Sequence, residues 1–278
     1  MRMKFSLTIF AALATGLMST AAIAATTTGT STTQAPSRIL DKLTLSYAGY
    51  YLGPSLAHPC AFTPNVDGSL SEDKQVFDSV IYGGYKVNSD LTASVGVPFN
   101  YYPVGGQDYL MKDPYLRFMH ANLLNRGTLN LAADLRIYLP VTTASDKAGI
   151  TSAVRSTQYL EYGIPDTRWT IGAATFIRGR TFTAEAQSGK DLELYLSPSV
   201  TYKISPTVSA VAGYEMYSNH LLRDGNLFNL STDTPADYSF GVNWDVSKKL
   251  TLNPYISGYT STQLKAAQFN VFISAKFL

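Results

Sequence analysis

The sequence predicts an all-β fold, an antiparallel up-and-down β-barrel of about twelve strands that are long enough to cross a membrane. Apolar and polar residues alternate with a period of two over long stretches, most clearly in residues 128–139 and 191–203, which is the pattern of strands with two different faces. Beyond residue 38 the apolar positions show no 3.6-residue periodicity. Short and long connections also alternate along the chain, as they do when consecutive strands form hairpins.

Residues 1–24 have the form of a secretory signal peptide. A short basic start precedes an apolar stretch, and Ala22-Ile23-Ala24 has the small-x-small pattern of a cleavage site. Residues 25–37 are rich in Thr and Ser and offer almost nothing to bury. We therefore expect a flexible periplasmic tail at 25–37, followed by a barrel domain at 38–278.

Charge and cysteine content exclude several classes of protein. The chain has 22 Lys and Arg against 20 Asp and Glu, and loss of Arg2 and Lys4 with the signal peptide leaves it neutral. A neutral chain has no electrostatic reason to bind nucleic acid, because that binding requires clustered positive charge. Cys60 is the only cysteine, so no internal disulfide can form. With 15% charged and 45% hydrophobic residues, the chain has either a large core or an apolar outer surface.

Turn signals divide the barrel domain into twelve segments. Five short turns recur about every 40 residues, at residues 88–90, 125–127, 165–167, 205–207 and 247–249. Longer connections lie between them, at residues 53–73, 104–111, 140–151, 183–189, 221–235 and 261–265. The segments that remain are about 11 to 15 residues long, which exceeds the usual strand of a soluble protein and suits a membrane crossing. A propeller also repeats at this interval, but its blades pack four short strands into that length.

The last segment adds a second signal. Every second residue of this segment is apolar, and these residues form the face expected to point outward: Phe269, Val271, Ile273, Ala275 and Phe277. Together with the even number of strands, this segment resembles the aromatic C-terminal strand of Gram-negative outer-membrane β-barrel proteins, although Leu278, not an aromatic residue, is terminal. The resemblance covers 39–278 and implies an outer-membrane location, contact with lipid and lipopolysaccharide, and insertion by the barrel-assembly machinery. An exported soluble β-sandwich is the alternative fold.

An apolar outer face leaves the polar face of each strand to line a lumen. Twelve tilted strands predict an opening of roughly 8 to 12 Å between side chains, wide enough for small polar solutes. We also expect aromatic girdles at the membrane boundaries, including Tyr47, Tyr50 and Tyr51 on the first strand and Phe99, Tyr101 and Tyr102 on the third. The first long loop, rich in Pro with several apolar residues, is expected to fold over or into the outer mouth.

Alternation places eight candidate pore-lining residues on the inner face: Arg117, Arg136, Arg155, Arg178, Asp134, Glu161, Glu193 and Glu215. The four arginines fall on four successive strands and are expected to form a slanting row across one wall. Guanidinium groups bind carboxylates and phosphates in a fork, so the row could select anions. Alternatively, the arginines pair with Asp134, Glu161 and Glu193 and only stiffen the wall.

Enzymatic chemistry has weak support in the sequence. Some outer-membrane barrels are lipid hydrolases with a His and a Ser two residues apart, and Ser218 and His220 are the only such pair, in reversed order. His58 and His120 lie in a loop and in the periplasmic half of a strand. No metal-ligand spacing or cofactor motif is present. The sequence thus predicts a porin-like channel for small hydrophilic or anionic solutes; a non-conducting structural or surface-interaction barrel and a lipid hydrolase are the alternatives.

Overall fold

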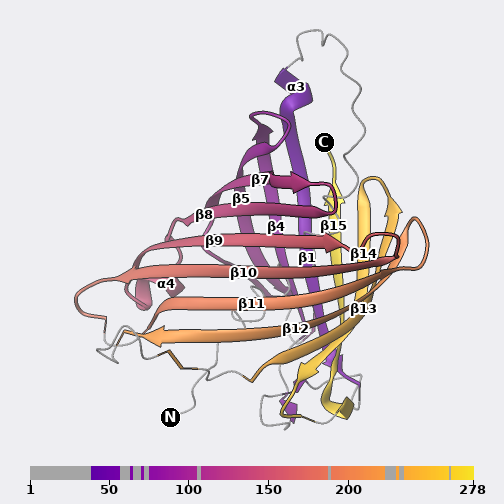
Figure 1. Cartoon of the computed structure of the whole chain (residues 1–278). Helices are drawn as coiled ribbons and strands as arrows, with labels where there is room; N and C mark the ends of the chain where they lie inside the picture. The colour runs from indigo at the N-terminus through magenta and orange to yellow at the C-terminus, as the bar shows by residue number, and fades with distance from the viewer. Residues whose placement is uncertain are drawn as a thin grey trace.

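Twelve strands of the computed structural model pair in a closed ring, which confirms the predicted all-β barrel (Figure 1). The first strand, β1 (Leu43–Ser55), pairs with β4 (Val76–Lys86) on one edge and with the last strand, β15 (Gln268–Lys276), on the other. Each wall strand therefore has a neighbour on both edges. Such closure is what a sheet in hydrocarbon requires, because an open edge leaves backbone N–H and C=O groups without partners.

The structure describes residues 39–56, 63–64, 70–71, 75–104, 108–186, 189–222, 230–231, 235–262 and 264–278. The expected signal peptide (1–24), the expected tail (25–37) and most of the first long loop lie outside these residues.

Nine further wall strands run between β4 and β15, each antiparallel to the next: β5 (Leu91–Tyr102), β7 (Tyr115–Arg126), β8 (Leu129–Tyr138), β9 (Ile150–Gly163), β10 (Trp169–Phe182), β11 (Lys190–Lys203), β12 (Val208–Leu221), β13 (Asp237–Ser247) and β14 (Leu250–Tyr259). Wall strands are 9 to 14 residues long, slightly shorter than expected. In Figure 1, β8 to β12 cross in front of β1, β4 and β15 at a steep angle, so the strands are strongly tilted around the barrel.

Shorter elements decorate the ends of the wall. They are α3 (Ile39–Lys42), β2 (Thr63–Pro64), β3 (Leu70–Ser71), β6 (Asp108–Met111), α4 (Thr143–Lys147) and η1 (Leu264–Ala266). The pair β2 and β3 forms a separate small hairpin, and β6 pairs only with the end of β5. Lys42 ends α3, and its Nζ lies 5.6 Å from the ring centre of Tyr85.

The predicted alternation of short and long connections is confirmed. Short connections occupy residues 87–90, 127–128, 164–168, 204–207 and 248–249. In the first of them the Asn88 Oδ1 accepts hydrogen bonds from the backbone N–H groups of Asp90 (2.9 Å) and Leu91 (2.8 Å), a local bond that favours a turn over continued strand. Gly127 adopts a φ of 62° in the second, a conformation that glycine takes without steric cost.

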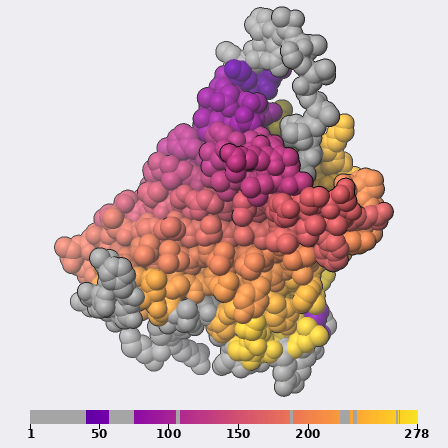
Figure 2. All heavy atoms as spheres, viewed as in Figure 1, coloured from indigo at the N-terminus to yellow at the C-terminus, as the bar shows by residue number. Residues whose placement is uncertain are grey.

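The two faces of the wall have opposite chemistry. Side chains such as Ile81, Ile171 and Phe240 point outward and are 43, 49 and 54% exposed, whereas Asp134 and Asn270 point inward and are buried. Figure 2 shows the outer surface over β7 to β12 as continuous. No helix in the described part of the chain is long and apolar enough to cross a membrane.

Aromatic side chains occur at both ends of the outward face. Tyr51, Phe77, Tyr101 and Tyr109 lie in a row on neighbouring strands at the long-loop end, with ring centres 5.0, 6.2 and 4.7 Å apart. Trp169 and Tyr202 form a matching pair, 4.7 Å apart, at the short-turn end. The expectations for Tyr50 and Tyr102 were wrong, because both face inward; the Tyr102 hydroxyl accepts a hydrogen bond from the buried Asn100 at 3.2 Å.

Tyr50 points into the barrel, where it is 4% exposed and its ring lies 4.6 Å from that of Phe272. The reason is the pleat of the strand, since adjacent residues such as Tyr50 and Tyr51 must face opposite sides.

Candidate functional site: the interior of the barrel

Four arginines lie side by side inside the barrel. Arg117 is the cross-strand partner of Arg136, Arg136 of Arg155, and Arg155 of Arg178. We call these four residues the arginine row. It crosses β7 to β10 and continues into Glu193 on β11. Inner and outer positions alternate along each strand with a fixed period of two, and the short turns align the inner positions of β7 with β8 and of β9 with β10.

Two carboxylates neutralise part of the row. The Asp134 Oδ2 lies 2.9 Å from Arg117 Nε and 2.8 Å from Arg136 Nη2. At the other end, the Glu193 Oε2 lies 3.0 Å from Arg178 Nη1 and 3.2 Å from Arg180 Nη2. Pairing of this kind offsets the desolvation of buried charges. The expected pairing with Asp134 and Glu193 is therefore present.

Arg155 differs from its neighbours. Its side chain is buried, at 1% exposed, and its Nε donates a hydrogen bond to Thr157 Oγ1 at 3.1 Å. Among the described residues, its Nη2 has no hydrogen-bond partner and no carboxylate lies within ion-pair distance. The guanidinium carbon instead lies 3.9 Å from the ring centre of Phe176, an attractive cation–π geometry.

Aromatic rings support the rest of the row. Arg117 lies 5.1 Å from the ring centre of Tyr82, Arg136 5.3 Å from Tyr115 and Arg178 5.6 Å from Tyr138. Together with Arg180, five guanidinium groups face two carboxylates, which leaves this wall with an excess of three positive charges. The wall is therefore attractive to anions.

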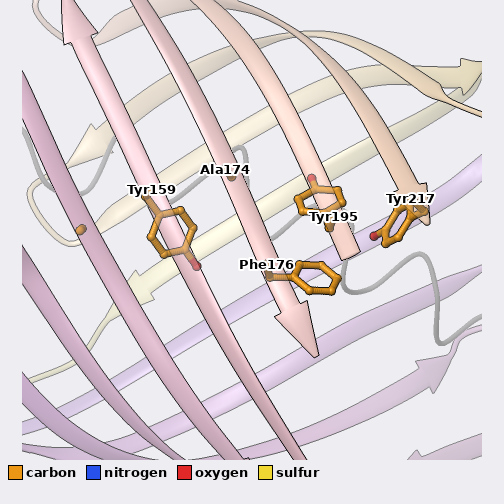
Figure 3. Close-up of a cluster of buried hydrophobic side chains, with 6 residues drawn as sticks. Tyr159, Ala174, Phe176, Tyr195 and Tyr217 are labelled. Carbon is orange, nitrogen blue, oxygen red and sulfur yellow. The ribbon is translucent and has the colours of Figure 1, made fainter. Parts of the chain in front are cut away.

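An aromatic row runs beside the arginine row, one inner position along each strand. Phe176, Tyr195 and Tyr217 are consecutive cross-strand partners on β10, β11 and β12, and neighbouring ring centres are 4.9 Å apart (Figure 3). Their rings project from the strands to the same, inner side, with Tyr159 and Ala174 nearby.

Glu161 and Glu215, the remaining predicted candidates, lie away from the arginine row. Glu161 is the cross-strand partner of Asn130 and Gly172, three inner positions from Arg155 along β9. Glu215 on β12 is paired in register with Asp237 on β13, and both are buried. Among the described residues, Glu215 Oε2 and Asp237 Oδ1 have no hydrogen-bond partner.

Three interior charges were missed by the sequence interpretation. Arg180 shares the inward parity of Arg178 and could have been found by it. Asp237 was placed at the edge of a loop, where parity cannot be assigned. Lys112, in the connection after β6, reaches Asp78 on β4 at 2.7 Å, a contact that only the folded connection brings about.

The interior is packed at the level of the arginine row. Arg155, Tyr159 and Phe176 are each 1% exposed. Residues lining a lumen of roughly 8 to 12 Å would be widely accessible to water. The width expected from the strand number is thus not available to water at this level, and a solute can pass only where these side chains give way.

The Ser218 and His220 pair has its own partners. His220 is buried, and its Nδ1 lies 2.6 Å from Asp191 Oδ1 on β11. The Ser218 hydroxyl donates a hydrogen bond to the backbone carbonyl of Ser231 at 3.4 Å. His120 lies on β7, and His58 falls outside the described residues.

No protein-family model matches the sequence, and no curated protein matches it either. Solved structures of outer-membrane channels do match in fold. An outer membrane channel from Pseudomonas putida F1 covers 90% of this chain and 100% of its own, with 11% identity and a TM-score of 0.53. The NanC porin (10% identity, TM-score 0.47) and the KdgM porin (8% identity, TM-score 0.48) each cover 84% of this chain and 99% of their own. The chain thus has the closed twelve-strand fold found in outer-membrane channels.

Proposed function

We propose that this chain is a porin-like channel of the outer membrane that passes small hydrophilic solutes and prefers anions. A barrel that is apolar outside and polar inside is suited to hydrocarbon around it and to a hydrated path within it. The leader would export the chain, the C-terminal strand would engage the barrel-assembly machinery, and the outer surface would contact lipid and lipopolysaccharide. No catalytic step is assigned to any residue.

One observation supports anion preference above all, the guanidinium of Arg155. A buried charge without a carboxylate partner is costly unless another group compensates it. Phe176 compensates part of that cost on one side, and the buried Nη2, which has no partner among the described residues, would bind an anion that passes when the surrounding side chains give way. Carboxylates suit this site because a guanidinium can donate two parallel hydrogen bonds to them.

The neighbouring arginines extend the attraction along the wall. Each of them is already engaged with Asp134 or Glu193, so they contribute mainly through the field of the excess charge. Screening by salt acts over about 8 Å at physiological ionic strength. We therefore propose a moderate anion preference instead of strict exclusion of cations.

Current recordings on refolded protein in planar bilayers test the proposal. With unequal KCl on the two sides, the sign of the reversal potential identifies the preferred ion. We expect an anion-selective current, and replacement of Arg155 by Gln should reduce its selectivity. Arg168→Gln, at an exposed short turn, is the control and should leave selectivity unchanged. A barrel that inserts but never conducts would support the structural alternative.

A further inference from the structure

The interior wall also holds an acidic site that the proposed function does not use. Glu215 and Asp237 are 6 and 8% exposed and adjoin each other in register on β12 and β13. Each has one carboxylate oxygen, Oε2 and Oδ1 respectively, with no hydrogen-bond partner among the described residues. Two buried acceptors side by side, with no cation beside them in the described part of the chain, form a site for a positively charged hydrogen-bond donor.

Tyr217 connects this acidic site with the arginine row. Its side chain is 7% exposed and its hydroxyl has no hydrogen-bond partner among the residues described. On β12 Tyr217 lies two residues from Glu215 and two from Asn219, and Asn219 is in register with Glu193 at the end of the arginine row. An unpartnered hydroxyl between an acidic and a basic site can donate to one end of a ligand and accept from the other.

We propose that the interior binds small linear zwitterions, with a carboxylate held by Arg155 and a protonated amine held by Glu215 and Asp237. This inference rests on the proposed channel function and names its substrate class. The aromatic row of Phe176, Tyr195 and Tyr217 lies between the two charged sites and offers an apolar surface to the carbon chain of the ligand (Figure 3).

Spacing in the sheet sets the length of the ligand. The register runs from Arg155 through Arg178 and Glu193 to Asn219, which lies three strands away on β12. Glu215 lies four residues before Asn219 on the same strand. The Cα atoms of Arg155 and Glu215 are thus about 19 Å apart along the wall. The long side chains of both residues shorten the gap between the charges. A ligand that bridges them carries its amine and carboxylate at opposite ends of a short chain, as a small peptide or an ω-amino acid does.

The test compares three solutes with the same carbon chain. In bilayer recordings of wild-type protein, 6-aminohexanoate should reduce the chloride current at a concentration severalfold lower than hexanoate or hexylammonium. The double variant Glu215→Gln/Asp237→Asn should lose that advantage, so that 6-aminohexanoate blocks no better than hexanoate, while its anion preference increases. Glu185→Gln, an exposed carboxylate after β10, should behave like the wild type.

Equal block by 6-aminohexanoate and hexanoate in the wild type would overturn the zwitterion site and leave the anion channel intact. If the protein does not conduct, the channel proposal fails, and equilibrium dialysis of labelled 6-aminohexanoate against the folded barrel in detergent decides the site alone. Binding that is lost in both the double variant and Arg155→Gln supports the site. Absence of binding to the wild type, or binding that survives in both variants, contradicts it.

Discussion

The guanidinium of Arg155 on β9 packs against the ring of Phe176 on β10, with 3.9 Å between the guanidinium carbon and the ring centre. Arg155 and Phe176 are diagonal neighbours on the inner face, because Phe176 is the cross-strand partner of Thr157, two residues beyond Arg155. Diagonal pairs in a sheet are within reach of long and aromatic side chains. The contact places the one guanidinium of the arginine row that has no carboxylate partner among the described residues beside an aromatic ring of the packed interior.

Replacement of Arg155 should change ion selectivity more than replacement of any other arginine in the row. Arg155→Glu reverses a charge that forms no ion pair with any described carboxylate, and we expect the ratio of anion to cation permeability to fall by up to about tenfold. Arg155→Lys should keep most of the preference, since the charge remains. The measurement is the reversal potential in a KCl gradient. An unchanged potential in Arg155→Glu would show that ions do not pass this residue.

Truncation of Phe176 should widen the path. Phe176 is 1% exposed, and Phe176→Ala removes the ring from the packed level of the lumen. We expect single-channel conductance to rise severalfold, with a loss of about 3 to 5 kcal/mol in the free energy of unfolding.

Phe176→Leu separates the two roles of this ring. Leucine keeps most of the apolar volume but removes the π face, so conductance should stay near the wild-type value while the cation–π contribution, about 0.5 to 2 kcal/mol, is lost. Phe240→Ala on the outward face is the control and should leave conductance unchanged. Equal conductance of Phe176→Ala and wild type would place the narrowest point elsewhere.

Closure of the ring by β1 and β15 predicts resistance to detergent. Their register pairs Tyr47 with Ala275 and Tyr51 with Val271, so loss of β15 would open the wall at two edges. We expect the unboiled protein to migrate differently from the boiled protein in SDS gels, and a chain truncated after residue 267 to show no such difference. Recovery of the untruncated protein from the soluble periplasm, without a shift, would contradict the membrane barrel.

Much of the fold and part of the site could be predicted from the sequence, for a specific physical reason. Period-two alternation fixes which face a residue occupies, and short turns fix the register of the strands that they join. Those two rules place Arg117 next to Arg136 and Arg155 next to Arg178, whereas Arg136 and Arg155 lie on strands joined by a long connection and are brought together by the pairing of β8 with β9. The same parity rule would have turned Tyr50 inward, had it been applied to the aromatic cluster.

Contacts that depend on strand ends and on the distance across the barrel could not be predicted. Asp237 begins its strand, so its face was undetermined, and the Lys112 contact with Asp78 depends on the path of a connection. Packing of Arg155, Tyr159 and Phe176 depends on how closely the opposite walls approach, which no local pattern encodes. For that reason the strand number alone overestimated the open width.

Removal of the Asp134 carboxylate should destabilise the barrel while strengthening its attraction for anions. The Asp134 Oδ2 pairs with both Arg117 and Arg136, and Asp134→Asn would leave the buried Arg136 and the partly exposed Arg117 without their counter-ion. Loss of one partner from a buried ion pair costs about 3 to 5 kcal/mol, because the remaining charge is uncompensated.

Urea unfolding in lipid vesicles measures this loss, and Asp134→Asn/Arg136→Gln should recover part of it by removing one of the two charges left without a counter-ion. Asp245→Asn is the matched control, because it removes a carboxylate charge at a half-exposed position where the amide oxygen can still accept the hydrogen bond from Thr251, and the expected change is at most about 1 kcal/mol. If Asp134→Asn unfolds at the same urea concentration as the wild type, the arginine row is held by its aromatic neighbours and not by this carboxylate.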